Sequence, residues 1–134
     1  MRNIVLDTNC LIACLSKKGK YHSVWISFLN GEYNLCISTD IIYEYEEIIA
    51  RKTSPEFAEM VLFVILNSEN TIRVNPNFRF GLITSDYDDN KFVDCAIIAN
   101  AEYLVSEDRH YNILKTIDFP KVNIISLRDF CAII

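Results

Sequence analysis

The chain has 134 residues, of which 51% are hydrophobic, and a formal net charge of −5 at pH 7. This length suits one domain with a sizeable core, and the composition excludes a disordered chain. Because phosphate binding favours a basic surface, the acidic balance excludes a protein that coats nucleic acid. It still allows a nuclease whose acidic residues are clustered.

The first half of the chain alternates short apolar runs with helical patterns. Apolar runs bounded by polar residues predict buried parallel strands, and apolar residues at helical spacing predict amphipathic helices. Ser38, Thr39 and Asp40 are N-cap candidates for one helix, and Pro55 stands at the first position of another. In chain order we predict a strand at 4–6, helices at 10–15 and 21–29, a strand at 33–37, a helix at 41–51, a helix that opens at 54–56 and runs to 66, and a strand at 71–74.

The second half begins with the one long irregular stretch, residues 75–90. Its acidic run starts at Asp86 but does not match a calcium-binding loop, because Lys91 and Ile97 stand where that loop needs Gly and Glu. Asp89 is expected to cap the helix that follows. The remaining elements are a helix at 90–101, a strand at 103–106, a short helix through residue 114, a strand at 122–125 and a helical turn at 127–131.

Strands and helices that alternate in this way predict a parallel sheet covered by helices. We therefore expect an α/β fold, a three-layer α/β/α sandwich whose central parallel sheet has about five strands. No linker or repeat interrupts the pattern, so residues 1–134 are expected to form a single domain.

The cysteines and the apolar runs indicate where the protein resides. No apolar run approaches the roughly 20 residues that span a bilayer, and the first residues lack the apolar middle of a signal peptide. The five cysteines fall inside predicted elements without a Cys-x-x-Cys pair, and only two histidines occur, so a structural zinc site is not expected. Reduced, buried thiols predict a cytoplasmic protein without membrane contact.

Four acidic residues lie where a strand pattern turns into a helix or near the opening of a helix. They are Asp7, Glu44, Asp94 and Asp108. The carboxyl ends of parallel strands share one edge of the sheet, where ligands bind. Carboxylates that converge there need a cation, and carboxylate and water ligands suit Mg²⁺ or Mn²⁺. A bound ion lowers the pKa of a water and stabilises charge on phosphorus, so the pattern predicts a metal-dependent hydrolase.

Each of these acids also has an ordinary structural role open to it. Asp7 and Asp108 could cap the helices that follow them. Glu44 could be a surface charge, and Asp94 could be a core carboxylate whose hydrogen bonds are satisfied. We prefer Glu44 to the other two glutamates of its helix because it lies nearest the strand edge.

Four blocks of sequence carry these acids: Asp7-Thr8-Asn9, Ile37-Ser38-Thr39 with Glu44, residues 89–94, and residues 101–108. Together, and in this order, they resemble a PIN domain, and more closely the branch related to VapC toxins of toxin–antitoxin systems. The resemblance spans nearly the whole chain. It implies a Mg²⁺- or Mn²⁺-dependent ribonuclease that cuts single-stranded RNA, with a cognate antitoxin protein and a homodimer as expected partners.

The resemblance also implies a role for individual residues. It places Asp7, Glu44, Asp94 and Asp108 at the acidic positions that act in catalysis and bind metal. Asp89 matches a further acidic position of this branch and is therefore expected to be either a metal ligand or a helix cap. Asn9 and Ser106 match the polar positions that orient the site.

The last block departs from the family pattern at Glu107, between Ser106 and Asp108. Ser106 keeps the hydroxyl that orients the aspartate, whereas Glu107 is expected to add negative charge beside the pocket. His110 and Tyr111, which follow, are expected at the surface.

Basic residues gather at a few places and are weak candidates for contact with RNA. A solvated surface is the alternative explanation for each. The candidates are Lys17, Lys18, Lys20, Lys91 and Arg109.

Two other classes of protein also place an aspartate after the first strand. A haloacid-dehalogenase-like phosphatase needs a second aspartate where Asn9 stands, and a response-regulator receiver needs a second acid where Thr8 stands. Neither class fits. The serious alternative is a catalytically weak PIN-like module that binds protein or RNA.

Overall fold

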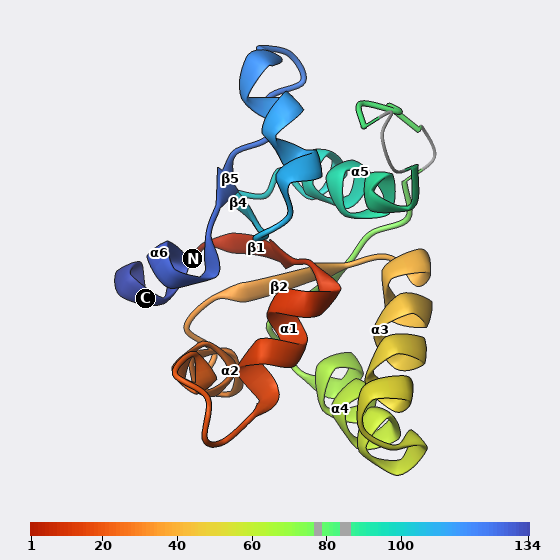
Figure 1. Cartoon of the computed structure of the whole chain (residues 1–134), viewed down its shortest axis with the longest axis vertical. Helices are drawn as coiled ribbons and strands as arrows, with labels where there is room; N and C mark the ends of the chain where they lie inside the picture. Colours follow the sequence, from red (N-terminus) through yellow and green to blue (C-terminus); the bar gives the residue numbers. More distant parts are fainter. Residues whose placement is uncertain (77–78, 84–86) are drawn as a thin grey trace.

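The computed structural model describes residues 1–76, 79–83 and 87–134 (Figure 1). Its centre is a five-stranded parallel sheet in the order β3-β2-β1-β4-β5. The strands are β1 (Asn3–Leu6), β2 (Asn34–Ile37), β3 (Thr71–Arg73), β4 (Tyr103–Val105) and β5 (Ile124–Ile125). The predicted α/β fold with a central parallel sheet of five strands is confirmed. The last strand is shorter than predicted.

Helices flank the sheet, as the sequence predicts. They are α1 (Thr8–Leu15), α2 (His22–Leu29), α3 (Thr39–Lys52), α4 (Pro55–Asn67), α5 (Asn90–Ile98) and α6 (Leu127–Ile133), with 3₁₀ helices η1 (Tyr87–Asp89) and η2 (Arg109–Thr116). Helix α5 ends three residues before the predicted limit of 101. Asn100, which follows it, has a φ of 51°, a left-handed conformation that often closes helices.

The strand order reverses next to β1, and this reversal creates the place where a site can form. From β1 the chain moves outward through β2 to β3, and then returns to build β4 on the other side of β1. Right-handed crossovers therefore place α1–α4 apart from α5 and η2, as Figure 1 shows. The carboxyl ends of β1 and β4 lie on either side of this reversal, where open α/β sheets bind ligands.

Side-chain caps fix where several helices begin. Ser38 Oγ accepts from the backbone N–H of Ile41, which selects Ser38 among the three predicted cap candidates for α3. The expected cap by Asp89 is wrong, because its side chain makes no capping hydrogen bond to α5. Asp89 ends η1 and its backbone is already helical, at φ −71° and ψ −19°, so its carboxylate is not turned back onto the helix.

The core lies between the sheet and the inner faces of the helices, and four of the five cysteines are buried in it as free thiols. Tyr111 was expected at the surface but is only 1% exposed. Its aromatic ring packs in the same core as Phe92 of α5. In the part of the chain that the structure describes, no helix has both the length and the apolar character to cross a membrane.

The irregular stretch between β3 and α5 is described in part. Residues 77–78 and 84–86 lie outside the described residues, and with them Asp86 of the acidic run. Segment 79–83 is fastened to α5. The side-chain amide of Asn90 donates to Ile83 O and its oxygen accepts from Ile83 N, each at 2.9 Å.

Candidate metal and active site

A cavity of about 330 Å³ opens beside the carboxyl end of β1. We call it the acidic cavity, because carboxylates from four separate segments line it: Asp7, Glu44, the adjacent Asp88 and Asp89, and Asp108. Asp7 directly follows β1, and Asp108 follows β4 by three residues. The topology thus brings together side chains that are up to 101 positions apart in the sequence (108 − 7).

Asp7 lies at the buried end of the acidic cavity and is 7% exposed. Its carboxylate accepts from the backbone N–H of Cys10 at 2.9 Å, so it caps α1, and from the Ser106 hydroxyl. Burial raises the pKa of Asp7 above its ordinary value, and the hydrogen bonds from Ser106 and Cys10 offset this in part. A cation in the cavity would favour the ionised form.

Ser106 links the two strands at the reversal of strand order. Its hydroxyl donates to Asp7 Oδ2, and its oxygen accepts from the backbone N–H of Asp108 at 3.0 Å. The side chain is 5% exposed, so solvent does not compete with these bonds. The residue therefore orients the first and last acids of the cavity together.

Both carboxylate oxygens of Glu44 have partners. Lys91 Nζ of α5 lies 2.8 Å from Oε1, and the Thr8 hydroxyl of α1 donates to Oε2. Glu47 differs, because it pairs with Arg51 at 2.9 Å and its side chain is 69% exposed. Of these two glutamates, Glu44 lines the acidic cavity and Glu47 does not.

Asp89 and Asp108 approach each other through a histidine. His110 Nδ1 lies 3.2 Å from Asp89 Oδ2 and 3.3 Å from Asp108 Oδ1. Asp108 also caps η2, because its carboxylate accepts from the backbone N–H of His110 at 2.9 Å. Among the described residues, these three form the group whose ligand atoms are close enough to hold one metal ion.

The sequence reasoning missed His110. It was expected simply at the surface, yet its imidazole contacts two of the acids, although 45% of its side chain is exposed. Its position two residues after Asp108 was the available signal. An aspartate that caps a short helix places the side chain of residue +2 beside its own carboxylate.

The structure does not bring Asp94 together with the other predicted acids. It is 3% exposed, accepts from the backbone N–H of Phe80 at 3.2 Å, and is absent from the lining of the acidic cavity. Five residues turn a helix by about 140°, so Asp89 and Asp94 face different directions. Phe92, on the face of Asp89, lines the cavity instead. Burial raises the pKa of Asp94, partly offset by the Phe80 hydrogen bond and Arg79.

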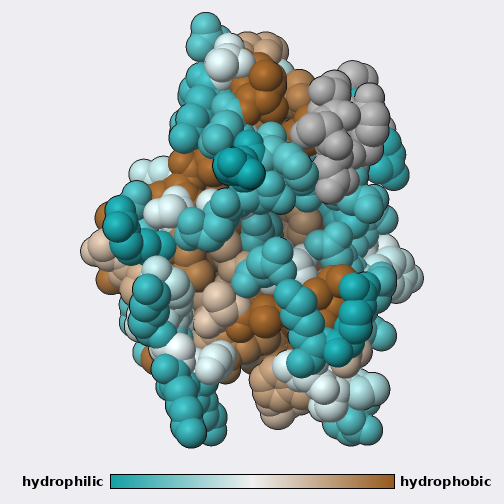
Figure 2. Space-filling view, in the orientation of Figure 1, coloured by the Kyte–Doolittle hydropathy of each residue, from teal (hydrophilic) through white to brown (hydrophobic). Residues whose placement is uncertain are grey.

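The basic candidates take different places. Lys91 pairs with Glu44, and Arg51 and Lys52 line the acidic cavity, where Lys52 Nζ lies 3.2 Å from Asn9 Oδ1. Arg109 lines a separate pocket, Lys20 lines a neighbouring cavity, and Lys17 and Lys18 are exposed. The face shown in Figure 2 is largely hydrophilic across its centre, with smaller apolar areas between the polar groups.

The donor set of the acidic cavity fits a divalent ion. Its carboxylate oxygens are hard ligands of the kind that Mg²⁺ and Mn²⁺ prefer, and His110 adds one nitrogen that suits Mn²⁺. Asp7, whose pKa is raised by burial, has no cationic partner among the described residues and would gain one.

Comparison with known proteins agrees with this fold. A family model described as PIN domain matches residues 3–110. VapBC2 from Rickettsia felis, solved bound to a DNA fragment from its promoter, is 15% identical, with a TM-score of 0.63 over 92% of this chain and 98% of that chain. The PIN domain endonuclease Utp24 is 19% identical, with a TM-score of 0.54 over 92% and 84%. No curated protein matches the chain. The chain belongs to the PIN domain family.

Proposed function

We propose that this protein is a Mg²⁺- or Mn²⁺-dependent endoribonuclease that cleaves single-stranded RNA. The observation that carries the proposal is the acidic cavity, where Asp7, Glu44, Asp89 and Asp108 converge at the reversal of strand order. Membership of the PIN domain family supports phosphodiester hydrolysis, and Utp24, which shares the fold, is an endonuclease.

In this proposal Asp89, Asp108 and His110 bind the metal, and Asp7 and Glu44 complete the set of ligands around the acidic cavity. Asp94, which the resemblance placed among the ligands, instead fastens segment 79–83 to α5. A bound divalent ion would lower the pKa of a water molecule and stabilise charge on the scissile phosphate. The protein supplies fixed ligands for it, because Ser106 and Cys10 hold the Asp7 carboxylate in place.

The surroundings of the cavity suit an anionic substrate. The positive charges of Lys91, Lys52 and Arg51 stand at its edge and partly balance the negative charge of the carboxylates. A phosphate group is therefore repelled less than it would be by the carboxylates alone. The net charge of −5 is therefore compatible with binding RNA at this place. Asn9, exposed at the rim and bonded to Lys52, is suited to orienting the phosphate or a metal-bound water.

We further propose that the protein is the toxin of a toxin–antitoxin pair and acts in the cytoplasm. The support is its likeness in fold to VapBC2, which was solved with promoter DNA, and the free state of all five of its cysteines. The test is co-expression with the product of the neighbouring reading frame. A complex that co-purifies and inhibits cleavage supports the proposal, whereas a neighbour that neither binds nor inhibits overturns it.

The test of the nuclease uses purified protein and an end-labelled single-stranded RNA, with Mn²⁺, Mg²⁺ or EDTA. We expect cleavage with either metal, none with EDTA, and a loss of about 100-fold or more in Asp89→Asn, with the exposed Asp129→Asn as a matched control. Metal should also raise the melting temperature, because a ligand bound only by the folded state stabilises it. RNA binding without metal-dependent cleavage would instead favour the alternative, a PIN-like binding module.

A further inference from the structure

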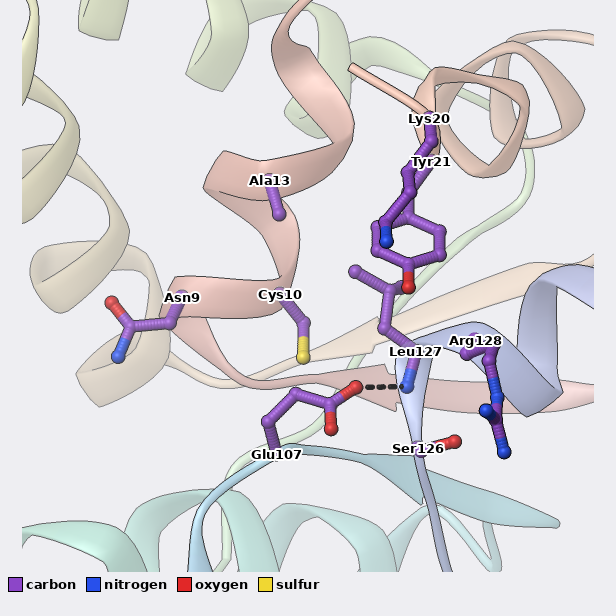
Figure 3. A pocket seen from close by; sticks show the side chains of 9 residues that line it. All are labelled: Asn9, Cys10, Ala13, Lys20, Tyr21, Glu107, Ser126, Leu127 and Arg128. Atoms are coloured by element: carbon purple, nitrogen blue, oxygen red, sulfur yellow. Dashed lines mark hydrogen bonds between the residues drawn. The ribbon is translucent and has the colours of Figure 1, made fainter.

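A second cavity, of about 560 Å³, adjoins the acidic cavity (Figure 3). We call it the side cavity, and its lining includes Asn9, Tyr21, Glu107 and Leu127. Asn9 lines both cavities, and Glu107 directly precedes Asp108 of the acidic cavity. An RNA strand whose phosphate lies in the acidic cavity can therefore extend its next nucleotide here. The volume is within the range of small-ligand sites, roughly 300–1,000 Å³.

Glu107 does not face the acidic cavity, contrary to the expectation that it adds charge there. Figure 3 shows its carboxylate inside the side cavity, between Cys10 and Leu127. Oε1 accepts from the backbone N–H of Leu127 at 2.7 Å, which fixes the direction of the group. Within the described ranges, no donor contacts Oε2. One carboxylate oxygen is thus held in place but keeps a second lone pair, and the other oxygen remains open, so the group can accept from two donors of a ligand.

The rest of the lining suits a flat aromatic ligand that carries phosphate. Tyr21 is half-buried and presents its ring to the side cavity, and Lys20 Nζ lies 5.3 Å from the centre of that ring. Aromatic rings of this kind stack on nucleobases in proteins that bind single strands, and the Lys20 ammonium supplies positive charge beside the ring. Arg128, which is exposed and also lines the cavity beside Leu127, adds a second positive charge for the sugar–phosphate backbone.

The chemistry of Glu107 selects among the four bases. A carboxylate only accepts hydrogen bonds, so it favours a base edge that presents donors side by side. Guanine offers N1–H and its amino group together on the Watson–Crick edge, which is accessible in single-stranded RNA. Adenine and cytosine place an acceptor nitrogen beside their amino group, and uracil flanks its one N–H with carbonyl oxygens. Guanine alone therefore pairs with a carboxylate without a repulsive contact.

We propose that the side cavity binds the guanine of a nucleotide adjacent to the scissile phosphate, with Glu107 recognising its Watson–Crick edge and Tyr21 stacking on its ring. This inference rests on the proposed function, because it names the sequence preference of the same nuclease. A carboxylate paired with two base donors discriminates by about fivefold or more.

A binding measurement without metal tests the subsite alone. In EDTA, wild-type protein is titrated with GMP, AMP, CMP and UMP and followed by saturation-transfer NMR. We expect GMP to bind at least about fivefold tighter than the others. Glu107→Gln should remove this preference, because glutamine keeps the oxygen that accepts from Leu127 N but replaces the open oxygen with a donor. The exposed Glu56→Gln is the matched control. Equal binding of all four nucleotides, or a preference that survives Glu107→Gln, overturns the proposal.

A cleavage measurement tests the subsite within the enzyme. A single-stranded RNA with a randomised segment is cut with Mn²⁺, and the product ends are sequenced. We expect guanine to be enriched at one position next to the cut in the wild type and in Glu56→Gln, and not in Glu107→Gln. Cleavage without enrichment overturns the subsite and leaves the nuclease intact. Absence of cleavage together with selective GMP binding overturns the nuclease and leaves the subsite intact.

Discussion

The two sides of the acidic cavity are held by different forces. On the strand side, Asp7 is buried and accepts hydrogen bonds from neutral groups, the Ser106 hydroxyl and the Cys10 backbone. On the helix side, Glu44 pairs with the Lys91 ammonium and Asp89 contacts the His110 imidazole. Neutral donors fix the direction of a carboxylate but leave much of the energetic cost of its burial, whereas a cation offsets the charge itself. The strand side thus sets position, and the helix side sets charge balance.

The largest effect is expected when the buried acid of the strand side, Asp7, is neutralised. Asp7→Asn should reduce cleavage to background, because it removes the one buried ligand, while its amide oxygen still accepts from Cys10 N. The same variant should stabilise the metal-free protein near neutral pH. Both effects are measured on one preparation, by RNA cleavage with Mn²⁺ and by thermal unfolding in EDTA, with the exposed Asp118→Asn as control.

The direction of the stability change follows from the raised pKa of Asp7. The folded protein binds this proton more tightly than the unfolded chain, so the carboxyl favours folding at acid pH. That contribution is lost as pH rises from the ordinary carboxyl pKa, about 3.9, through the raised value. The Asp7→Asn variant has no carboxyl at this position, so its stability does not fall in this way as pH rises. A metal-free melting temperature that falls in the variant at pH 7 would contradict this account.

A second change separates two acids of the same segment. Asp89→Asn should lower cleavage by about 100-fold or more, whereas Asp94→Asn should change it less than about threefold, because only Asp89 lines the acidic cavity. Asparagine at 94 keeps the oxygen that accepts from Phe80 N. Single-turnover rates at saturating Mn²⁺ decide the matter. Equal losses would show that both faces of α5 reach the metal.

Within α3, the comparison rests on two glutamates one turn apart. Glu44→Gln should lower cleavage by about tenfold or more, because it removes a charge from the cavity and the partner of Lys91. Glu47→Gln should change the rate less than about threefold, since it breaks only an exposed pair with Arg51. Both are assayed on the same RNA. The reverse order would mean that the wrong turn of the helix faces the metal.

Removing the hydroxyl of Ser106 tests whether position is set on the strand side. Ser106→Ala should lower kcat by roughly tenfold, the usual scale for groups that orient a metal ligand, with little change in KM. The affinity for Mn²⁺, measured by calorimetry, should fall as well. A loss confined to KM would assign Ser106 to RNA binding instead of ligand orientation.

The sequence predicts the fold well because the spacing of its apolar residues and the residues that mark the helix starts indicate the same elements. Short apolar runs give the five strands, and Ser38 and Pro55 mark where helices begin. Asp7, Glu44 and Asp108 also reach one cavity as expected, since each stands at or near a strand end and the sheet collects those ends at one edge.

The choice between Asp89 and Asp94 could not be made in the same way. The apolar pattern of α5 continues on both sides of Asp94, so periodicity alone does not tell which face meets the sheet edge. The direction is set by η1, which makes the backbone helical before α5 begins, so that the Asp89 side chain makes no capping hydrogen bond to α5. The direction of the Glu107 side chain could not be predicted either, because its hydrogen-bond partner Leu127 lies 20 positions away in the sequence.

Segment 79–83 is hydrogen-bonded to α5 at two points, from Phe80 to Asp94 and between Ile83 and Asn90. These hydrogen bonds fix the orientation of α5, and with it the direction of the Asp89 side chain. The orientation therefore does not depend on how the chain connects β3 to segment 79–83. Lengthening a loop costs little, since each doubling adds only about 0.6 kcal/mol of closure entropy. Residues 75–76, which lie between β3 and these hydrogen bonds, are thus a natural place to insert a tag or to exchange loops between homologues without disturbing the site downstream.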